Sequence, residues 1–564
     1  MTDEGAGGRG RGRMFRSALK SEEFGSSARQ EGPLGGRAAR SLCVVIVLAV
    51  LAASAALLVL PPRIYSRTMV WDLLFNLSGA WAIFNGLSFH TDVHDPLGGG
   101  SFWLTVLGFR LVGVSLWAFL AGKIAMSATV FVLATVVTLR RLSPVPAALF
   151  MLMVSQLCLL PTNTGDLLDD FTFAMPYNLY GWSIVSVLAL ALFLPPAERG
   201  RGHWWDVAVV ACLLALLFCL KITYYLAGLG ICVAAFVVNP SVLARWRSWA
   251  VAMLATTAVL MGPWNWPYLA DIASAIGSGA VRSRILELLV MFSANAFELA
   301  IYLAVLLVAI ALWRAKWVSF HLILATLALY GASVAILSQN AQLRGLTLCS
   351  VTFFLLYGHL NPKRSSRDFP LSYLLAALMI LPGILCVNTT LSLGLYARRA
   401  FNDFNTHTVE TSALKGLSVP IETVPAWHAL SARSGDYSWR SRTRSVHGDP
   451  PVTQLQYVQT ILEAVGLLQR DGREPGGVAV IDQVNPLPFA LGWAPPVGGN
   501  LWYDLGFPWP SADVALANVR YVLVPKFPTS VEISKEALHR FGPYLERHYR
   551  LELESESWQL LLRR

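Results

Sequence analysis

Acidic and histidine residues gather in a short stretch between two apolar segments of the chain. Asp72, Asp92, His94 and Asp95 fall within residues 71–100 of a protein that is otherwise poor in charge. A carboxylate beside a lipid bilayer is costly unless it faces water or takes part in chemistry. The stretch is therefore a candidate functional loop. The competing interpretation is a solvated connection in which Asp and Gly residues only form turns.

Two other polar groups are expected at the same membrane surface. A second loop carries Asp166, Asp169 and Asp170, and Lys221 ends an apolar span. Carboxylates and a lysine there suit transfer from a lipid-linked phosphate, because the cation neutralises the phosphate and a carboxylate removes a proton from the acceptor hydroxyl. Such a site can work without metal, so no cofactor is certain, but paired carboxylates can also hold a divalent cation.

Each of these residues also has a structural interpretation. Asp72 can cap a helix, Asp92 and Asp95 can be turn residues, and the acids of the second loop can simply be solvated. Lys221 can extend along the membrane interface. Arg282, in a later external stretch, can bind a pyrophosphate or a lipid headgroup, or serve only at the surface.

The composition is that of a polytopic membrane protein. Of 564 residues, 55% are hydrophobic and 14% are charged, and the mean hydropathy is +0.53. The net charge is +10, but Lys and Arg cluster in the short connections between apolar spans, as cytoplasmic loops do. Nucleic acid is therefore not an expected partner. The seven cysteines lie in or beside apolar spans, so no disulfide is expected in the C-terminal region.

The alternation of apolar segments and basic connections predicts about eleven transmembrane helices. Residues 1–40 are predicted to be a disordered basic cytoplasmic tail. Residues 41–395 are predicted to form the transmembrane domain, with external loops at 61–116 and 161–177 and an interfacial helix at 101–112. Spans are expected at 41–60, 117–139, 144–160, 179–194, 205–220, 226–238, 249–261, 297–313, 320–337, 346–360 and 371–391.

An odd number of spans places the C-terminal region outside the cytoplasm. Residues 396–564 are predicted to form a small extracytoplasmic α/β domain, with helices at 454–468 and 534–547. Strands are expected at 478–482, 521–524, 549–553 and 558–562, the last two as a hairpin. The Arg-rich residues 435–451 are expected to be an exposed loop.

The order of these features resembles the GT-C membrane glycosyltransferases, which include the aminoarabinose lipid A transferase and the protein O-mannosyltransferases. An Asp follows the first span (Asp72), and the run AWAIFNGLSFHTDVHDPLG and a short helix precede the second. The LKIT stretch at 220–223 is similar to a lysine-bearing turn of these enzymes. YNLYGWS, at 177–183, is similar to the opening of the fourth span in bacterial members.

The resemblance implies roles for three residues. Asp72 would be the acid nearest the acceptor, Lys221 would contact the donor phosphate, and Asp169 would complete the catalytic site. The chain departs from many members where Leu73 follows Asp72 in place of Glu, and where Ile222 follows Lys221 in place of Pro or Gly.

Together these features predict a mainly α-helical, GT-C-like enzyme of the bacterial inner membrane with a cytoplasmic N-terminus. It is expected to move a sugar from a polyprenyl-phosphate donor to an extracytoplasmic glycan, lipid or protein. One alternative is a transporter or flippase, against which the sequence shows no internal repeat with paired broken helices. The other is a noncatalytic membrane protein whose external domain binds a partner.

Overall fold

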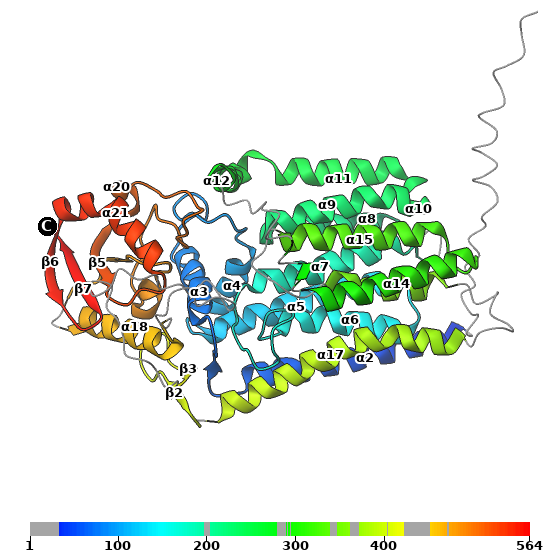
Figure 1. The fold of residues 1–564 in the computed structure, drawn as a ribbon, viewed down its shortest axis with the longest axis horizontal. Coiled ribbons are helices and arrows are strands. Elements are labelled where there is room, and N and C mark those ends of the chain that lie inside the picture. Colours follow the sequence, from blue (N-terminus) through cyan, green and yellow to red (C-terminus); the bar gives the residue numbers. More distant parts are fainter. Residues whose placement is uncertain are drawn as a thin grey trace, which may run out of the picture.

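The protein is described here by a computed structural model that covers residues 33–196, 203–278, 289, 292–293, 295–338, 347–360, 371–402, 404–421, 452–470 and 473–564. Residues 1–32 of the predicted tail and the predicted loop at 435–451 lie outside the described residues. Figure 1 shows a bundle of roughly parallel helices beside a smaller part that contains a β-sheet.

The bundle is built from helices that follow one another along the chain. They are α2 (Pro33–Val59), α5 (Trp117–Thr138), α6 (Pro144–Leu159), α7 (Pro176–Phe193), α8 (His203–Leu220), α9 (Ile222–Val238), α11 (Trp246–Leu260), α14 (Ala296–Arg314), α15 (Phe320–Ser338), α16 (Val351–His359) and α17 (Leu371–Phe401). The short elements α10 (Pro240–Leu243), η1 (Pro263–Asn265) and η2 (Thr347–Ser350) lie between them.

The predicted spans are therefore helical. Within the described ranges, six helices are long and apolar enough to cross a membrane: α2, α5, α7, α14, α15 and α17. The chain is an integral membrane protein, while the expected total of about eleven crossings stays a prediction.

Two helices begin where the sequence analysis did not expect them. α2 begins at Pro33, before the predicted start at Ser41, and proline suits the first position of a helix. The predicted external loop 61–100 contains α3 (Val70–Phe84), most of whose residues are buried. α4 (Gly100–Val112) matches the helix expected at 101–112, while its interfacial position stays a prediction.

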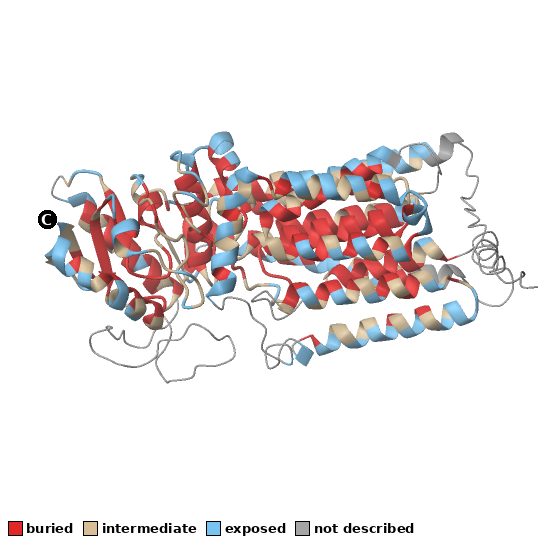
Figure 2. Ribbon diagram, turned by 90° about the horizontal axis from the view of Figure 1, so that it is seen from above, coloured by how far each residue is buried: buried red, intermediate tan, exposed pale blue. Residues whose placement is uncertain are grey.

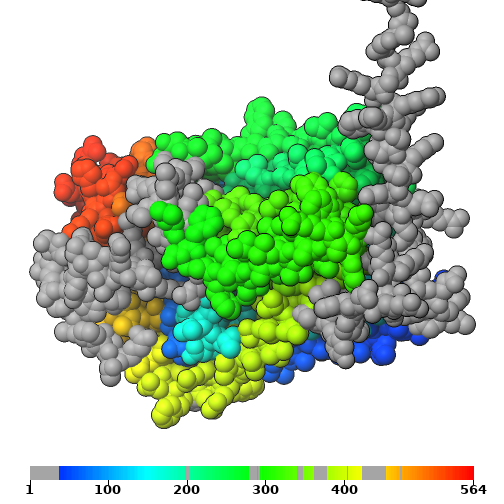
Figure 3. Space-filling view, turned by 45° about the vertical axis from the view of Figure 1, so that its right-hand side comes forward, coloured from blue at the N-terminus to red at the C-terminus, as the bar shows by residue number. Residues whose placement is uncertain are grey.

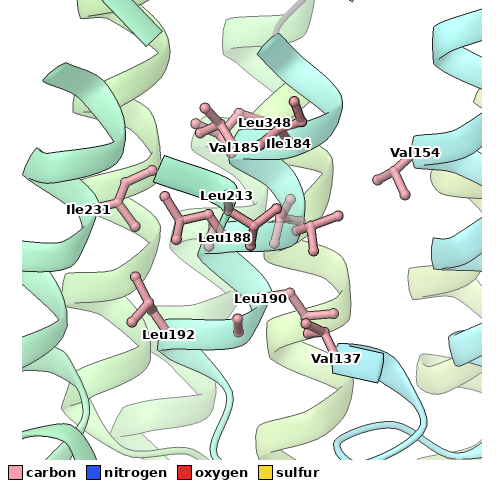
Figure 4. Packing of buried hydrophobic residues seen from close by; sticks show 14 of the residues in the cluster. Val137, Val154, Ile184, Val185, Leu188, Leu190, Leu192, Leu213, Ile231 and Leu348 are labelled. Atoms are coloured by element: carbon pink, nitrogen blue, oxygen red, sulfur yellow. The ribbon is translucent and has the colours of Figure 1, made fainter. Parts of the chain in front are cut away.

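The core of the bundle surrounds α7. Of its most apolar window, 94% is buried inside the protein, against 11% for α14, so α7 packs on protein whereas α14 is left to face lipid. Figure 2 shows the buried middle of the bundle. Figure 4 shows Ile184, Val185 and Leu188 packing with side chains of neighbouring helices. The green face in Figure 3 belongs to the α14 and α15 region at the surface.

A small mixed sheet dominates the C-terminal part. Its strands are β4 (Gly477–Val480), β5 (Val519–Pro525), β6 (Tyr549–Glu554) and β7 (Trp558–Arg563), in the order β4-β5-β7-β6. β4 and β5 are parallel, and the other neighbours are antiparallel. The accompanying helices are α18 (Gln454–Gln469), α19 (Leu487–Leu491), α20 (Ala512–Ala515) and α21 (Val531–His548). The predicted helices and strands of this region are found here.

A second, three-stranded sheet ties the two parts together. β1 (Ile64–Tyr65), just after α2, pairs with β3 (Leu417–Pro420), which also pairs with β2 (Thr406–Thr408) after α17. β1 follows α2 and β3 follows α17, so the pairing of these strands holds the end of α2 beside the end of α17.

A buried ion pair closes the opposite end of the bundle. Asp206, on the first turn of α8, lies 2.8 Å from Arg140 and 3.0 Å from Arg141. The Arg141 side chain is 1% exposed, and its guanidinium also donates to the carbonyls of Leu194 and Ala191 at the end of α7. The pair therefore joins α5, α7 and α8.

We expect Asp206→Ala to destabilise the protein strongly, because it leaves the buried Arg141 charge without its partner. Loss of one member of a buried pair costs about 3–5 kcal/mol. Thermal unfolding in detergent measures the effect. The exposed Glu536–Arg540 pair of α21 supplies the control, since Glu536→Ala should cost at most about 1 kcal/mol. Similar losses for both variants would contradict this account.

Candidate functional site

One carboxylate holds the two histidines of the first loop. α12 (Trp266–Gly277) carries Asp271, whose Oδ2 lies 2.9 Å from His90 Nδ1 and whose Oδ1 lies 3.0 Å from His94 Nδ1. The backbone N–H of Asp95 approaches the same carboxylate at 3.4 Å. The loop singled out in the sequence is therefore fastened to α12 through the Asp271 side chain.

These hydrogen bonds favour the charged forms of their partners. Burial raises the pKa of Asp271, but hydrogen bonds from His90 and His94 outweigh it, so the pKa lies below its ordinary value. The Asp271 hydrogen bond raises the pKa of His94, against the opposing effect of burial. His94 and Asp271 thus form an ion pair when the imidazole is protonated.

The His94–Asp271 pair should stabilise the fold most in mild acid. The raised His94 pKa contributes stability that is fully present below pH 6.5 and is lost as the pH rises through that pKa. The lowered Asp271 pKa contributes stability that is lost only as the pH falls below about 3.8. We expect His94→Gln to lower the melting temperature more at about pH 5.5 than at about pH 8.5. Equal losses at both values would show that the charge of His94 contributes nothing.

Asp95 is the buried acid of this loop, with only 4% of its surface exposed. Its Oδ1 accepts a hydrogen bond of 2.8 Å from the Leu97 N–H. Burial raises the pKa of Asp95 to about 7, although the Leu97 hydrogen bond and the charge of Lys221 act in the opposite direction. Asp95 is therefore a carboxyl group that exchanges its proton near neutral pH, within electrostatic reach of a lysine.

Lys221 lies at the break between α8 and α9. Its backbone is extended, with φ −167° and ψ 132°, and the Gly98 N–H donates to the Leu220 carbonyl at 3.1 Å. A Cβ on residue 98 would lie 2.0 Å from the Cys219 carbonyl oxygen, so this approach requires glycine. The Lys221 ammonium lies 5.2 Å from the centre of the Tyr177 ring, a distance typical of a cation–π contact.

The first loop, the α8–α9 break and α12 therefore meet at one place, which we call the loop–α12 site: His90, His94, Asp95, Lys221 and Asp271. Tyr268 of α12 stacks at a tilt on His90, with ring centres 4.6 Å apart. An ammonium group can bind a phosphate, and a carboxyl group with a pKa near 7 can accept a proton from a hydroxyl. The site thus offers both functions side by side.

Asp92 contributes a turn to this loop. Its Oδ2 accepts a hydrogen bond of 2.7 Å from the Ser88 N–H, which is the arrangement of an Asp that closes a turn. The charge of Asp92 also raises the pKa of His94, but by less than the Asp271 hydrogen bond does.

Asp72 lies at a different place, in the first turn of α3, with 7% exposure. There the Val70 N–H donates to Gln454 Oε1 at 2.7 Å, and the Trp71 ring meets the Tyr457 ring edge-on at 6.0 Å. Burial raises the pKa of Tyr457, and the charges of Asp482 and then Asp72 raise it further. The loop with Asp95 follows the far end of α3, which is about 22 Å long. The residues just before Asp72 therefore contact α18.

The acids of the second loop contact the chain just before α3. Asp169 forms an ion pair with Arg67, and Asp170 Oδ1 accepts a hydrogen bond of 2.6 Å from Thr68. Both side chains of the Arg67–Asp169 pair are more than 40% exposed. The backbone N–H of Asp166 donates to Asn163 within the loop. These contacts fasten the second loop to residues 67–68.

Arg282 lies outside the described residues. Among the residues that are described, no group of three or more His, Cys, Asp and Glu side chains is arranged to hold a metal ion.

Two further charged residues of interest were not predicted from the sequence. Asp271 is the only acid in the YLADIASAIG segment. The amphipathic pattern of that segment, which begins at Tyr268, was the available signal. Lys123 of α5 is 1% exposed, with its ammonium 5.8 and 5.7 Å from the rings of Phe119 and Tyr180. A lysine inside an apolar span is itself a signal.

No protein-family model and no curated protein matches this sequence. A structural match to a solved protein is found instead. The chain is similar to ArnT. The crystal structure of ArnT from Cupriavidus metallidurans bound to undecaprenyl phosphate aligns with 92% of this chain and 97% of that chain, with 12% identity and a TM-score of 0.45. The apo structure of ArnT has the same coverage and identity and a TM-score of 0.43. The roles proposed below rest on the geometry of this chain.

Proposed function

We propose that the protein transfers a sugar from a polyprenyl-phosphate donor to a hydroxyl group at the extracytoplasmic membrane surface. The observation that supports this best is the proximity of Asp95 and Lys221. Asp95 is a buried carboxyl group with a pKa of about 7, and the charge of Lys221 acts to lower that pKa. Both lie where the apolar helices α8 and α9 meet the external loop, which is where a lipid phosphate would reside.

In the proposed reaction Lys221 binds the donor phosphate. The bond between the sugar C1 and the phosphate oxygen breaks, and the polyprenyl phosphate leaves with both electrons of that bond. Lys221 neutralises the negative charge that grows on this leaving group. The acceptor oxygen forms the new bond to C1, and its proton passes to the Asp95 carboxylate.

Asp271 acts in this proposal as a positioning residue. It holds His90 and His94 by their Nδ1 atoms and approaches the backbone of Asp95. A loop held in this way keeps its carboxyl oriented, and a displacement of about 1 Å in such a group can cost about a hundredfold in rate.

The sequence-based roles of Asp72 and Asp169 as catalytic acids remain predictions. The ion pair of Asp169 with Arg67, and the contacts of Val70 and Trp71 beside Asp72 with α18, support structural roles, so we assign the base to Asp95. A divalent cation is not needed for the proposed chemistry. The bacterial inner membrane, the extracytoplasmic C-terminal region and the glycan, lipid or protein acceptor belong to the same proposal.

The purified protein in liposomes tests the function. A radiolabelled undecaprenyl-phosphate sugar is the donor, presented with a library of glycan, lipid and peptide acceptors. Transfer that is lost in both Asp95→Asn and Lys221→Ala supports the proposal. Movement of the donor between leaflets without transfer would instead identify a flippase. Full loss in Asp72→Asn together with full activity in Asp95→Asn would overturn our choice of base.

A further inference from the structure

One face of α12 packs against the protein. Tyr268 and Ala275 are buried on that face, and Asp271 holds the two histidines of the first loop from it. These residues are spaced three and four positions apart, which places them on one side of a helix. The opposite side of α12, which we call the outer face, is exposed and consists of Trp266, Ala270, Ala273, Ser274 and Gly277.

The outer face carries no charge. Asp271 is the only charged residue from Met261 to Gly277, and its carboxylate is turned toward the histidines. Trp264 and Trp266, at the start of the helix, are 66% and 62% exposed. A helix face in water normally carries charged or polar residues, whereas Trp is enriched where a helix meets the membrane surface. The composition of the outer face therefore fits the boundary between lipid headgroups and acyl chains better than it fits water.

α12 lies at the level where the apolar bundle ends. The Tyr268 ring meets the Phe218 ring edge-on, with ring centres 5.2 Å apart, and Phe218 lies in the last turn of α8, just before the break at Lys221. In Figure 1 α11 runs lengthwise along the bundle, whereas α12 is seen nearly end-on beside the end of α11. α12 therefore crosses the direction of the bundle helices, as a helix in the plane of the membrane surface does.

The outer face continues an apolar surface of the bundle. α11 packs on α8 and turns Val251, Leu254 and Val259 outward, with 65, 70 and 57% of their surface exposed. No charged residue lies between Arg247 and Asp271. An exposed apolar surface of this kind on a bundle that crosses the membrane marks contact with lipid. Only the short η1 turn separates α11 from α12, so lipid around α11 would reach α12.

We propose that the outer face of α12 lies in the interfacial layer of the lipid bilayer. An interfacial helix buries its apolar side by about 5–10 Å at the boundary between headgroups and acyl chains. Trp264 and Trp266 anchor the start of the helix at this depth. Attraction to anionic headgroups contributes little, because the outer face has no Lys or Arg.

The inner side of α12 connects this bilayer contact to the first loop. Asp271 lies 2.9 Å from His90 and 3.0 Å from His94, and it approaches the N–H of Asp95. A helix held in the bilayer thus holds the loop with Asp95 at the membrane surface, where a lipid-linked phosphate lies. This consequence for transfer rests on the proposed function, whereas the bilayer contact itself does not.

Spin labels on the full-length protein in phosphatidylcholine liposomes test the bilayer contact. The label is attached to Ala273→Cys on the outer face, after Cys43, Cys212 and Cys219 have been replaced by Ala, since the other cysteines are buried. Lys535→Cys, at an exposed position of α21, is the control in water. Oxygen concentrates in lipid and a nickel chelate stays in water. We expect oxygen to relax the Ala273→Cys label more than the chelate does, and the reverse order for Lys535→Cys.

Two results would overturn the proposal. If the nickel chelate relaxes the Ala273→Cys label as strongly as the Lys535→Cys label, the outer face lies in water. A label shielded from both reagents would place this face against protein, such as a second copy of the chain. Ala270→Cys, one turn earlier on the same face, gives the same test if Ala273→Cys does not fold.

The lipid composition distinguishes apolar insertion from attraction to charge. Addition of phosphatidylglycerol to the liposomes should leave the relaxation of the Ala273→Cys label unchanged. Lipid contact that forms only with this anionic lipid would overturn the proposal in favour of binding to headgroup charge.

A charge on the outer face tests the connection to the first loop. Ala270→Glu should raise the access of the nickel chelate to the Ala273→Cys label, and it should lower the transfer rate by about tenfold or more. Ala270→Ser, small and uncharged, should change neither. Full transfer by Ala270→Glu with its label in water would overturn the connection to the loop. If the wild-type protein transfers no sugar, the proposed function fails, and the label measurement still decides the bilayer contact.

Discussion

Lys221→Ala is expected to lower the rate of sugar transfer by roughly 10²–10³-fold. The Lys221 ammonium is a positive charge at the α8–α9 break, and it acts to lower the pKa of the buried Asp95. Without it, the leaving phosphate would develop its charge next to Asp95 and Asp271 with no counter-charge from this position. The rate with a radiolabelled polyprenyl-phosphate sugar, measured at saturating donor, gives the effect.

The control is an exposed lysine on another face, Lys535 of α21, whose replacement by Ala should leave the rate within about twofold. Lys221→Arg keeps the charge but presents a planar fork in place of a compact ammonium, so partial activity is expected. A Lys221→Ala protein that folds and retains its full rate would remove Lys221 from the reaction.

Asp95→Asn is expected to cost about 10²–10⁴-fold, the usual contribution of a positioned general base. Burial raises the pKa of Asp95 to about 7, and the active form is the carboxylate. The wild-type rate should therefore rise with pH up to about 7 and level off above it. Below that value it should fall about tenfold for each pH unit.

The pH profile separates catalysis from structural damage. The residual rate of Asp95→Asn should lose this acidic limb, since Asn does not titrate in this range. Other groups face Asp95 from neighbouring elements, namely Asp271 and Tyr268 of α12 and Lys221 beside α8. The Asp271→Asn profile is therefore the comparison, and it should keep an acidic limb even if the midpoint moves. An unchanged limb in Asp95→Asn would assign the titration to another residue.

The helices and strands were predictable because their patterns are local. Apolar runs bounded by basic residues identified segments such as 117–139, found as Trp117–Thr138. The C-terminal strands were readable from short β-branched and aromatic runs between turns. α3 was missed because it is buried on nearly all sides and carries Asp72 and Asn76, so its apolar residues show no simple periodicity.

The candidate site was only partly predictable, because its contacts are distant in sequence. The residues of the first loop and Lys221 were recognised by type and position. The approach of the loop that carries Asp95 to the α8–α9 break depends on the close contact of Gly98 with Cys219. The contact between His94 and Asp271 joins residues 177 positions apart. No local pattern around Asp271 indicates its two histidine partners, and no local pattern around Trp71 indicates its contact with Tyr457.

Photocrosslinking tests the central claim most directly. A polyprenyl phosphate with a photoreactive group beside its phosphate would be bound to the protein in liposomes, irradiated, and the adducts mapped by mass spectrometry. We expect adducts on residues 90–98 and on peptides around Lys221, with strong loss in Lys221→Ala. Adducts confined to the start of α3 and to α18 would place the phosphate beside Asp72 and contradict the account.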